Sequence, residues 1–202
     1  MLKLISQKMK KILVINGAQK FLHSQGSLNK SITELSVNYL ENREGFEVKF
    51  TNVDDTYIIE EEVEKFVWAD VIIYHTPIWW FSIPFGFKKY IDEILTHGEN
   101  KIYVSDGRHR VEPKLHYGTG GLLKGKKYIL TTSWNAPEEA FTLENEFFDQ
   151  KSVDEGAMFG FHKMNSFIGL EKLGTYHFYD VMKDPKIEQD FKNYTALLDE
   201  LL

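Results

Sequence analysis

Short apolar runs alternate with amphipathic segments along nearly the whole chain. In each run the side chains are apolar either continuously or at every second position, which is typical of strands with one or both faces buried. Five segments fit this description: KILVIN (11–16), FEVKF (46–50), DVIIYHTP (70–77), KKYILTTS (126–133) and KLGTYHFYDV (172–181).

Apolar residues spaced three and four positions apart predict helices between these runs. The helical segments are 28–45, 58–68, 84–95, 157–168 and 184–201. We expect Gly45 to end the first, Pro84 to open the third, and Asp184 with Pro185 to cap the last. Strands that alternate with helices predict an α/β protein with a doubly wound, five-stranded parallel sheet.

In such a sheet, ligands bind beyond the carboxyl ends of the strands, at the point where the strand order reverses. The loops 17–28, 76–84 and 131–142 follow three of the predicted strands and are rich in polar, glycine or aromatic residues. We therefore expect these three loops to form the functional site.

Composition narrows the class of protein. With 202 residues and 43% hydrophobic content, the chain suits one core, so residues 11–202 are interpreted as a single domain. Residues 1–10 are interpreted as an extension, either disordered or a misassigned start of the chain. The net charge of −6, without a long basic run, argues against nucleic acid as a partner.

Cysteine and histidine usage excludes further chemistry. The absence of cysteine removes disulfides and thiolate catalysis, and the seven histidines show no metal-binding spacing, so no metal site is expected. No apolar stretch approaches the roughly 18 residues of a membrane span, and the first residues do not form a signal sequence. The sequence predicts a cytoplasmic protein that does not insert into membranes.

The first loop, NGAQKFLHSQGSLNKS, ends in small polar residues at the entry to a helix. Free backbone N–H groups and the helix dipole favour a phosphate there, with Lys20 and His23 as nearby donors. The alternative is ordinary capping of the helix by Ser27 or Asn29, and the sequence leaves both open. The motifs of a P-loop and of a dinucleotide-binding Rossmann fold are absent.

The second loop, HTPIWWFSIPFG, places bulky rings at the end of a central strand, where packing against helices is already complete. A planar ligand sandwiched against an indole would explain them, whereas the alternative is a hydrophobic lid or a dimer contact. SWNAPEEAF after the fourth strand repeats this pattern, and YGTGG offers glycines that let a backbone approach a ligand closely.

Six stretches taken together resemble one known family. They are NGAQKFLHSQGSLN, PIWWFSIPFGFKKYID, SDGR, YGTGG, GKKYILTTSWNAPEEAF and FHKMN. In order and spacing they are similar to the bacterial NAD(P)H:quinone reductases called modulator of drug activity B. The resemblance implies a flavodoxin-like fold, FAD as cofactor, NADPH or NADH as hydride donor, two-electron ping-pong reduction of quinones to hydroquinones, and a homodimer with the active site at its interface.

The resemblance also implies site residues, carried over motif by motif. For the FAD pyrophosphate these are His23, Ser24, Gln25, Gly26, Leu28, Asn29 and Ser31. For the flavin slot they are Pro77, Ile78, Trp79, Trp80, Phe81, Ser133, Trp134, Asn135 and Ala136, with Tyr117, Gly120 and Gly121 over the ring.

Tyr117 and His162 are the candidates to protonate or orient the quinone oxygen, because of their chemical type. Two other functions stay open at this point. One is a flavodoxin-type carrier that holds FMN and passes single electrons, and the other is a flavin- or quinone-sensing protein without turnover.

Overall fold

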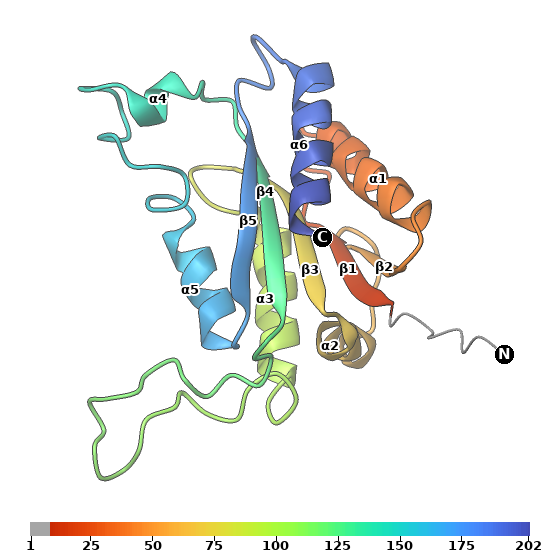
Figure 1. The fold of residues 1–202 in the computed structure, drawn as a ribbon. Coiled ribbons are helices and arrows are strands. Elements are labelled where there is room, and N and C mark those ends of the chain that lie inside the picture. The colour runs from red at the N-terminus through yellow and green to blue at the C-terminus, as the bar shows by residue number, and fades with distance from the viewer. Residues whose placement is uncertain (1–8) are drawn as a thin grey trace, which may run out of the picture.

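A central sheet of five parallel strands in the order β2-β1-β3-β4-β5 organises the structure, a computed structural model that describes residues 9–202 (Figure 1). The strands are β1 (Lys10–Asn16), β2 (Phe46–Asn52), β3 (Val71–Pro77), β4 (Lys127–Ser133) and β5 (Glu171–Phe178). The helices are α1 (Ser27–Glu41), α2 (Ile59–Trp68), α3 (Phe85–His97), α4 (Glu139–Thr142), α5 (Phe159–Phe167) and α6 (Ile187–Leu201). The predicted fold class is confirmed, whereas the proposed extension falls almost entirely outside the described residues.

Some predicted boundaries were wrong. α1 ends at Glu41, before Gly45, because the Asn42 amide nitrogen Nδ2 donates to the Asn38 carbonyl at 2.7 Å and satisfies the helix end. β5 ends at Phe178, because the chain turns away from the sheet at Asp180, whose φ is 47°. Lys186 takes the N-cap position of α6, so Asp184 does not cap that helix.

Two hydrophobic layers cover the sheet. On one face, Ile12 and Val14 of β1 pack with buried residues of α1 and α6, among them Ile32 and Tyr194. On the other face, Leu13 and Ile15 pack with buried residues of α2, α3 and α5. The alternation along β1 therefore builds a three-layer, doubly wound sandwich (Figure 1).

The two edges of the sheet carry different loops. The segments after β1, β3, β4 and β5 gather at the carboxyl edge, whereas the long irregular stretch 98–126 lies at the amino edge, below the sheet in Figure 1. The strand order reverses between β1 and β3, so the carboxyl ends of these two strands are where this fold binds ligands.

Candidate active site

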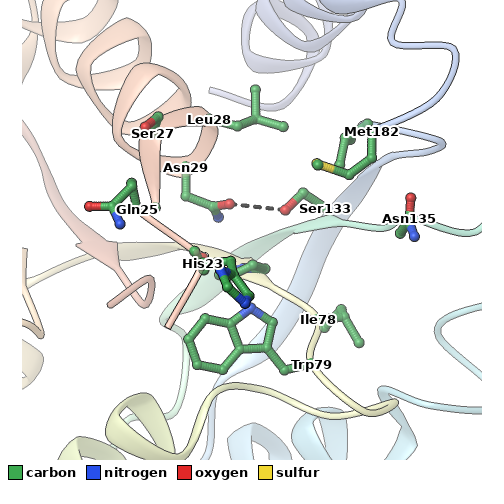
Figure 2. A pocket seen from close by; sticks show the side chains of 14 residues that line it. His23, Gln25, Ser27, Leu28, Asn29, Ile78, Trp79, Ser133, Asn135 and Met182 are labelled. Atoms are coloured by element: carbon green, nitrogen blue, oxygen red, sulfur yellow. Dashed lines mark hydrogen bonds between the residues drawn. The ribbon is translucent and has the colours of Figure 1, made fainter. Parts of the chain in front are cut away.

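A cavity of about 580 Å³ opens at the carboxyl edge, where β1 and β3 end (Figure 2). All three loops expected from the sequence contribute to it, and so does the segment after β5. The lining residues are His23, Ser24, Gln25, Gly26, Ser27, Leu28, Asn29, Pro77, Ile78, Trp79, Ser133, Asn135, Val181 and Met182.

The first loop presents uncapped backbone N–H groups to this cavity. Gly26 occupies the N-cap position of α1 with a φ of 68°, and no side chain of residues 9–202 caps the first turn by a hydrogen bond. The first N–H groups of a helix have no acceptor within the helix. Neither Ser27 nor Asn29 caps α1, so the structure favours the anion-binding interpretation of this loop over the capping interpretation.

Asn29 adds a side-chain donor at the same place. The Ser133 hydroxyl donates to Asn29 Oδ1 at 2.9 Å, and Asn29 is only 3% exposed. Its Nδ2 atom has no hydrogen-bond partner within residues 9–202. A buried donor without a partner costs about 1–3 kcal/mol, which a ligand acceptor would recover.

The second loop forms a two-residue turn that separates its rings. Trp79 and Ser82 exchange backbone hydrogen bonds of 2.8 and 3.1 Å, and Trp80 and Phe81 between them have φ values of 48° and 65°. Both values are unusual for bulky residues, and asparagine and glycine are preferred in such turns. The turn directs Trp79 to the cavity and leaves Trp80 93% exposed, so neither Trp80 nor Phe81 lines the cavity.

Neighbouring rings fix Trp79 in place. Its ring lies 5.6 Å from Phe21 and 6.5 Å from Phe85, measured between centroids. Phe21 itself belongs to a tight turn, in which it exchanges backbone hydrogen bonds with Ser24. The aromatic wall of the cavity is therefore held by the first loop and by the start of α3.

The third loop contributes Ser133 and Asn135 to the cavity, whereas Trp134 between them is buried beneath it. The Ile78 amide donates to the Ser133 carbonyl at 3.0 Å, which ties the second loop to the third. Ala136 does not line the cavity, and its carbonyl accepts from the Asp180 amide at 3.0 Å.

Sequence reasoning missed Ser27, Val181 and Met182. The sequence indicates Ser27 only as a helix cap and predicts Val181 as part of the fifth strand. Because β5 ends at Phe178, the residues that follow it reach the carboxyl edge. In a parallel sheet, the loop that follows each strand lies at the carboxyl edge. Applying this rule to the fifth strand as well would have identified Val181 and Met182.

Several predicted site residues lie elsewhere in the chain's own structure. Ser31 is one turn into α1, where its hydroxyl donates to the Ser27 carbonyl. Tyr117 is 70% exposed at the amino edge, with its ring 5.8 Å from that of Phe167. His162 lies on α5 and bonds to Tyr128 and Asp154.

The two glycines of the YGTGG motif serve the packing of this same loop. A Cβ on Gly120 would lie 2.1 Å from the Ser105 carbonyl oxygen, and a Cβ on Gly121 would lie 2.2 Å from the Ile168 carbonyl carbon. Within one chain, neither glycine approaches the cavity.

Among the described residues that line the cavity there is no lysine or arginine, and His23 is the only titratable one. An anion bound there would be held by the dipoles of backbone and side-chain N–H groups.

Among residues 9–202, no group of three histidine, aspartate or glutamate side chains is arranged to hold a metal ion. Nor does that part of the chain contain a helix long and apolar enough to cross a bilayer.

A doubly wound parallel sheet in the order β2-β1-β3-β4-β5, with a cavity at its switch point, defines the flavodoxin-like class of proteins. The chain belongs to it, since the flavodoxin-like fold family matches residues 10–202. Within this class it is a member of the quinone reductases of the modulator of drug activity B type. It is 47% identical over 190 residues to the NADPH:quinone oxidoreductase MdaB of Haemophilus influenzae, covering 94% of this chain and 98% of the relative. The family resemblance and the prediction of an enzyme are confirmed.

Solved structures share the fold. The general stress protein 14 of Treponema denticola in complex with FMN superimposes with a TM-score of 0.68 at 20% identity, over 96% of this chain and 99% of its own. An FMN-dependent NADH-azoreductase of Bacillus anthracis in complex with FMN gives a TM-score of 0.69 at 15% identity, over 96% of this chain and 100% of its own.

Proposed function

We propose that the protein is an FAD-dependent NAD(P)H:quinone oxidoreductase that reduces quinones to hydroquinones by two electrons in a ping-pong sequence. NADPH or NADH donates the hydride. The observation that carries the proposal is the unpartnered Asn29 Nδ2 at the uncapped start of α1, in a cavity that has an aromatic wall.

The polar middle of the cavity suits a pyrophosphate. Asn29 Nδ2, the first backbone N–H groups of α1 and the Ser24 and Ser27 hydroxyls would donate to its oxygens. Glycine suits this position, since the φ of Gly26, 68°, is left-handed and an added Cβ would lie 3.3 Å from the Ala18 Cβ. These residues fit an anionic group without any basic side chain.

Two apolar ends flank this middle, which supports FAD over FMN. Figure 2 shows Ile78 and Trp79 on one side of the Asn29–Ser133 hydrogen bond and Leu28 and Met182 on the other. A dinucleotide has a ring system at each end of its pyrophosphate, so both apolar ends would be used. A mononucleotide would leave the end at Leu28 and Met182 empty.

Trp79, Pro77 and Ile78 would hold the isoalloxazine ring and exclude water from one of its faces. The bound flavin supplies hydride transfer, which no side chain of the protein can provide. The protein would orient the ring and leave part of the cavity open to both substrates in turn, as the proposed ping-pong sequence requires.

We also propose a homodimer with the active site at its interface. Tyr117 cannot reach the cavity of its own chain, because it lies at the opposite edge of the sheet. A second copy could bring Tyr117 of the partner subunit over the open face, where its hydroxyl would orient or protonate the quinone oxygen. The partner subunit would then cover the exposed Trp80 and Leu22, which lie at the tips of the two tight turns.

The cytoplasmic location stays a prediction from the sequence.

The test is an anaerobic absorbance titration of the purified protein loaded with FAD. We expect one equivalent of NADPH to bleach the oxidised flavin bands and one equivalent of menadione to restore them. Bands that NADPH leaves unchanged would support the sensor. If menadione did not reoxidise the reduced flavin, and two equivalents of a one-electron acceptor protein did, the result would support the electron carrier.

A further inference from the structure

Both ring nitrogens of His162 are engaged away from the cavity. The Tyr128 hydroxyl lies 2.7 Å from Nδ1, and Asp154 Oδ1 lies 3.0 Å from Nε2. Because a carboxylate only accepts, Nε2 carries the hydrogen, and in the neutral ring Nδ1 accepts from Tyr128. No nitrogen of His162 is left to act on a substrate.

Asp154 is the centre of this network. Besides His162, it accepts from Lys172 at 2.8 Å and Thr175 at 3.0 Å, and His177 Nε2 lies 3.4 Å from its Oδ1. Burial by itself would raise the pKa of Asp154, but hydrogen bonds from His162, His177 and Lys172 outweigh it and hold this pKa well below its usual range. The carboxylate is therefore ionised throughout the neutral range.

The network continues from His177 to the third loop of the site. His177 Nδ1 lies 2.7 Å from Thr132 Oγ1, and the indole Nε1 of Trp134 donates to the same oxygen at 2.7 Å. Since His177 Nε2 faces a carboxylate, Nδ1 of the neutral ring accepts the Thr132 hydroxyl hydrogen. The Thr132 hydroxyl thus accepts from one partner and donates to the other, at a position only 1% exposed.

Trp134 connects this network to the cavity wall. Its backbone N–H donates to the Phe178 carbonyl at 2.8 Å, and its carbonyl accepts from the Val181 amide at 3.0 Å. The flanking residues Ser133 and Asn135, together with Val181, line the cavity. The backbone of Trp134 therefore joins the end of β4 to the end of β5 and to the segment after it, beside the cavity wall.

We propose that Asp154 is a positioning residue for the flavin site, which acts through His177 and Thr132 to fix Trp134 and the cavity wall. The inference rests on the proposed function. The network orients groups and does not conduct protons to the site, because it ends at an indole N–H, which donates but has no lone pair to accept. His162 holds Asp154 in place and is not the acid of the reaction.

The first test is the pair Thr132→Val and Thr132→Ser. Valine keeps the shape and removes the hydroxyl, whereas serine keeps the hydroxyl. We expect Thr132→Val to bind FAD about tenfold more weakly and to change the visible circular dichroism of the bound flavin, and Thr132→Ser to restore both. The matched control is Thr51→Val on β2, a buried threonine that does not line the cavity and whose hydroxyl donates to Glu62 at 2.7 Å. It should leave FAD binding and the flavin signal unchanged.

A second pair covers the case in which Thr132→Val does not fold. Trp134→Phe removes the indole N–H and Asp154→Asn removes the charge, and each should weaken FAD binding to a similar degree. Wild-type values of FAD affinity and flavin dichroism in Trp134→Phe and Asp154→Asn would overturn the inference. Failure of the wild-type protein to bind FAD or to oxidise NADPH would instead refute the proposed function, so the two failures are distinguishable.

Discussion

The Ser133 hydroxyl donates to Asn29 Oδ1 across 2.9 Å and joins the end of β4 to the start of α1. The bond uses the acceptor of the Asn29 amide and leaves Nδ2 without a partner among the described residues. The two residues are 104 positions apart in the chain. Their contact sets the direction of a donor that neither loop could orient alone.

The substitution Asn29→Asp tests this donor. An aspartate replaces Nδ2 by an oxygen that repels phosphate, so we expect FAD to bind at least about tenfold more weakly, measured by quenching of flavin fluorescence. The control is Asn38→Asp, at an exposed position of the same helix, which should bind FAD as the wild type does. Equal binding by Asn29→Asp and the wild type would remove Asn29 from the site.

Gly26→Ala tests the backbone conformation of the first loop and its packing against Ala18. Gly125→Ala is its matched control, because both glycines have positive φ values, 68° and 80°, but a Cβ on Gly125 would meet nothing within 4 Å. We expect both variants to lose about 1 kcal/mol of unfolding free energy in urea. Only Gly26→Ala should also weaken FAD binding, and a loss in both would point to a general effect of stability.

Met182→Asp tests the choice of FAD over FMN. Met182 lines the apolar end of the cavity beyond the Asn29–Ser133 bond, and it is 76% exposed, so the variant should fold. We expect weaker binding of FAD and unchanged binding of FMN, measured by calorimetry. Ile58→Asp, an exposed apolar residue before α2, serves as control and should change neither. An equal loss for both flavins would contradict the assignment of this end to the adenine.

Tyr117→Phe should slow quinone reduction more than it weakens FAD binding, because it removes only the hydroxyl. We expect a lower rate of flavin reoxidation by menadione in stopped-flow measurements, with FAD affinity unchanged. An equal loss of FAD affinity and rate would defeat this role for Tyr117.

The proposed dimer allows a second test of Tyr117, in which the activity of mixed variants is measured. When Tyr117→Phe and Asn29→Asp subunits are mixed, a hybrid dimer contains one intact site only if Tyr117 acts across the interface. We expect the mixture to regain quinone reductase activity above that of either variant alone. Activity equal to the average of the two variants would place Tyr117 in the site of its own chain or outside the site.

His75 makes the stability of the protein depend on pH. It is fully buried on β3, where Nδ1 contacts the Thr131 hydroxyl at 2.7 Å and Nε2 contacts the Ser36 hydroxyl at 3.0 Å. Burial lowers the pKa of His75 to about 3, from an unfolded value of about 6.5. The folded state excludes the proton, so the contribution of His75 is complete above pH 6.5 and decreases as the pH falls towards 3.

We expect the unfolding free energy to fall by about 2 kcal/mol from this group between pH 7 and pH 5, measured in urea. His75→Gln should flatten the curve in that window, whereas an unchanged slope would show that other groups cause the pH dependence.

The sheet and its loops were predictable because their signals are local. The apolar runs predicted the five strands, and the carboxyl-edge rule for parallel sheets placed the three loops correctly at the cavity. Boundaries such as Phe178 and Glu41 were not predictable, because they depend on the φ of Asp180 and on the side-chain hydrogen bond of Asn42.

The sequence alone determined the fold class and the three loops of the site, because strand and helix periodicity and the residues after each strand are properties of neighbours in the chain. Only the tertiary structure decided which rings face the cavity, that Tyr117 lies at the far edge, and that His162 is tied to Asp154. The physical reason is that these outcomes depend on the backbone turn at Trp80 and on hydrogen bonds between distant segments. No local pattern of side chains encodes such contacts.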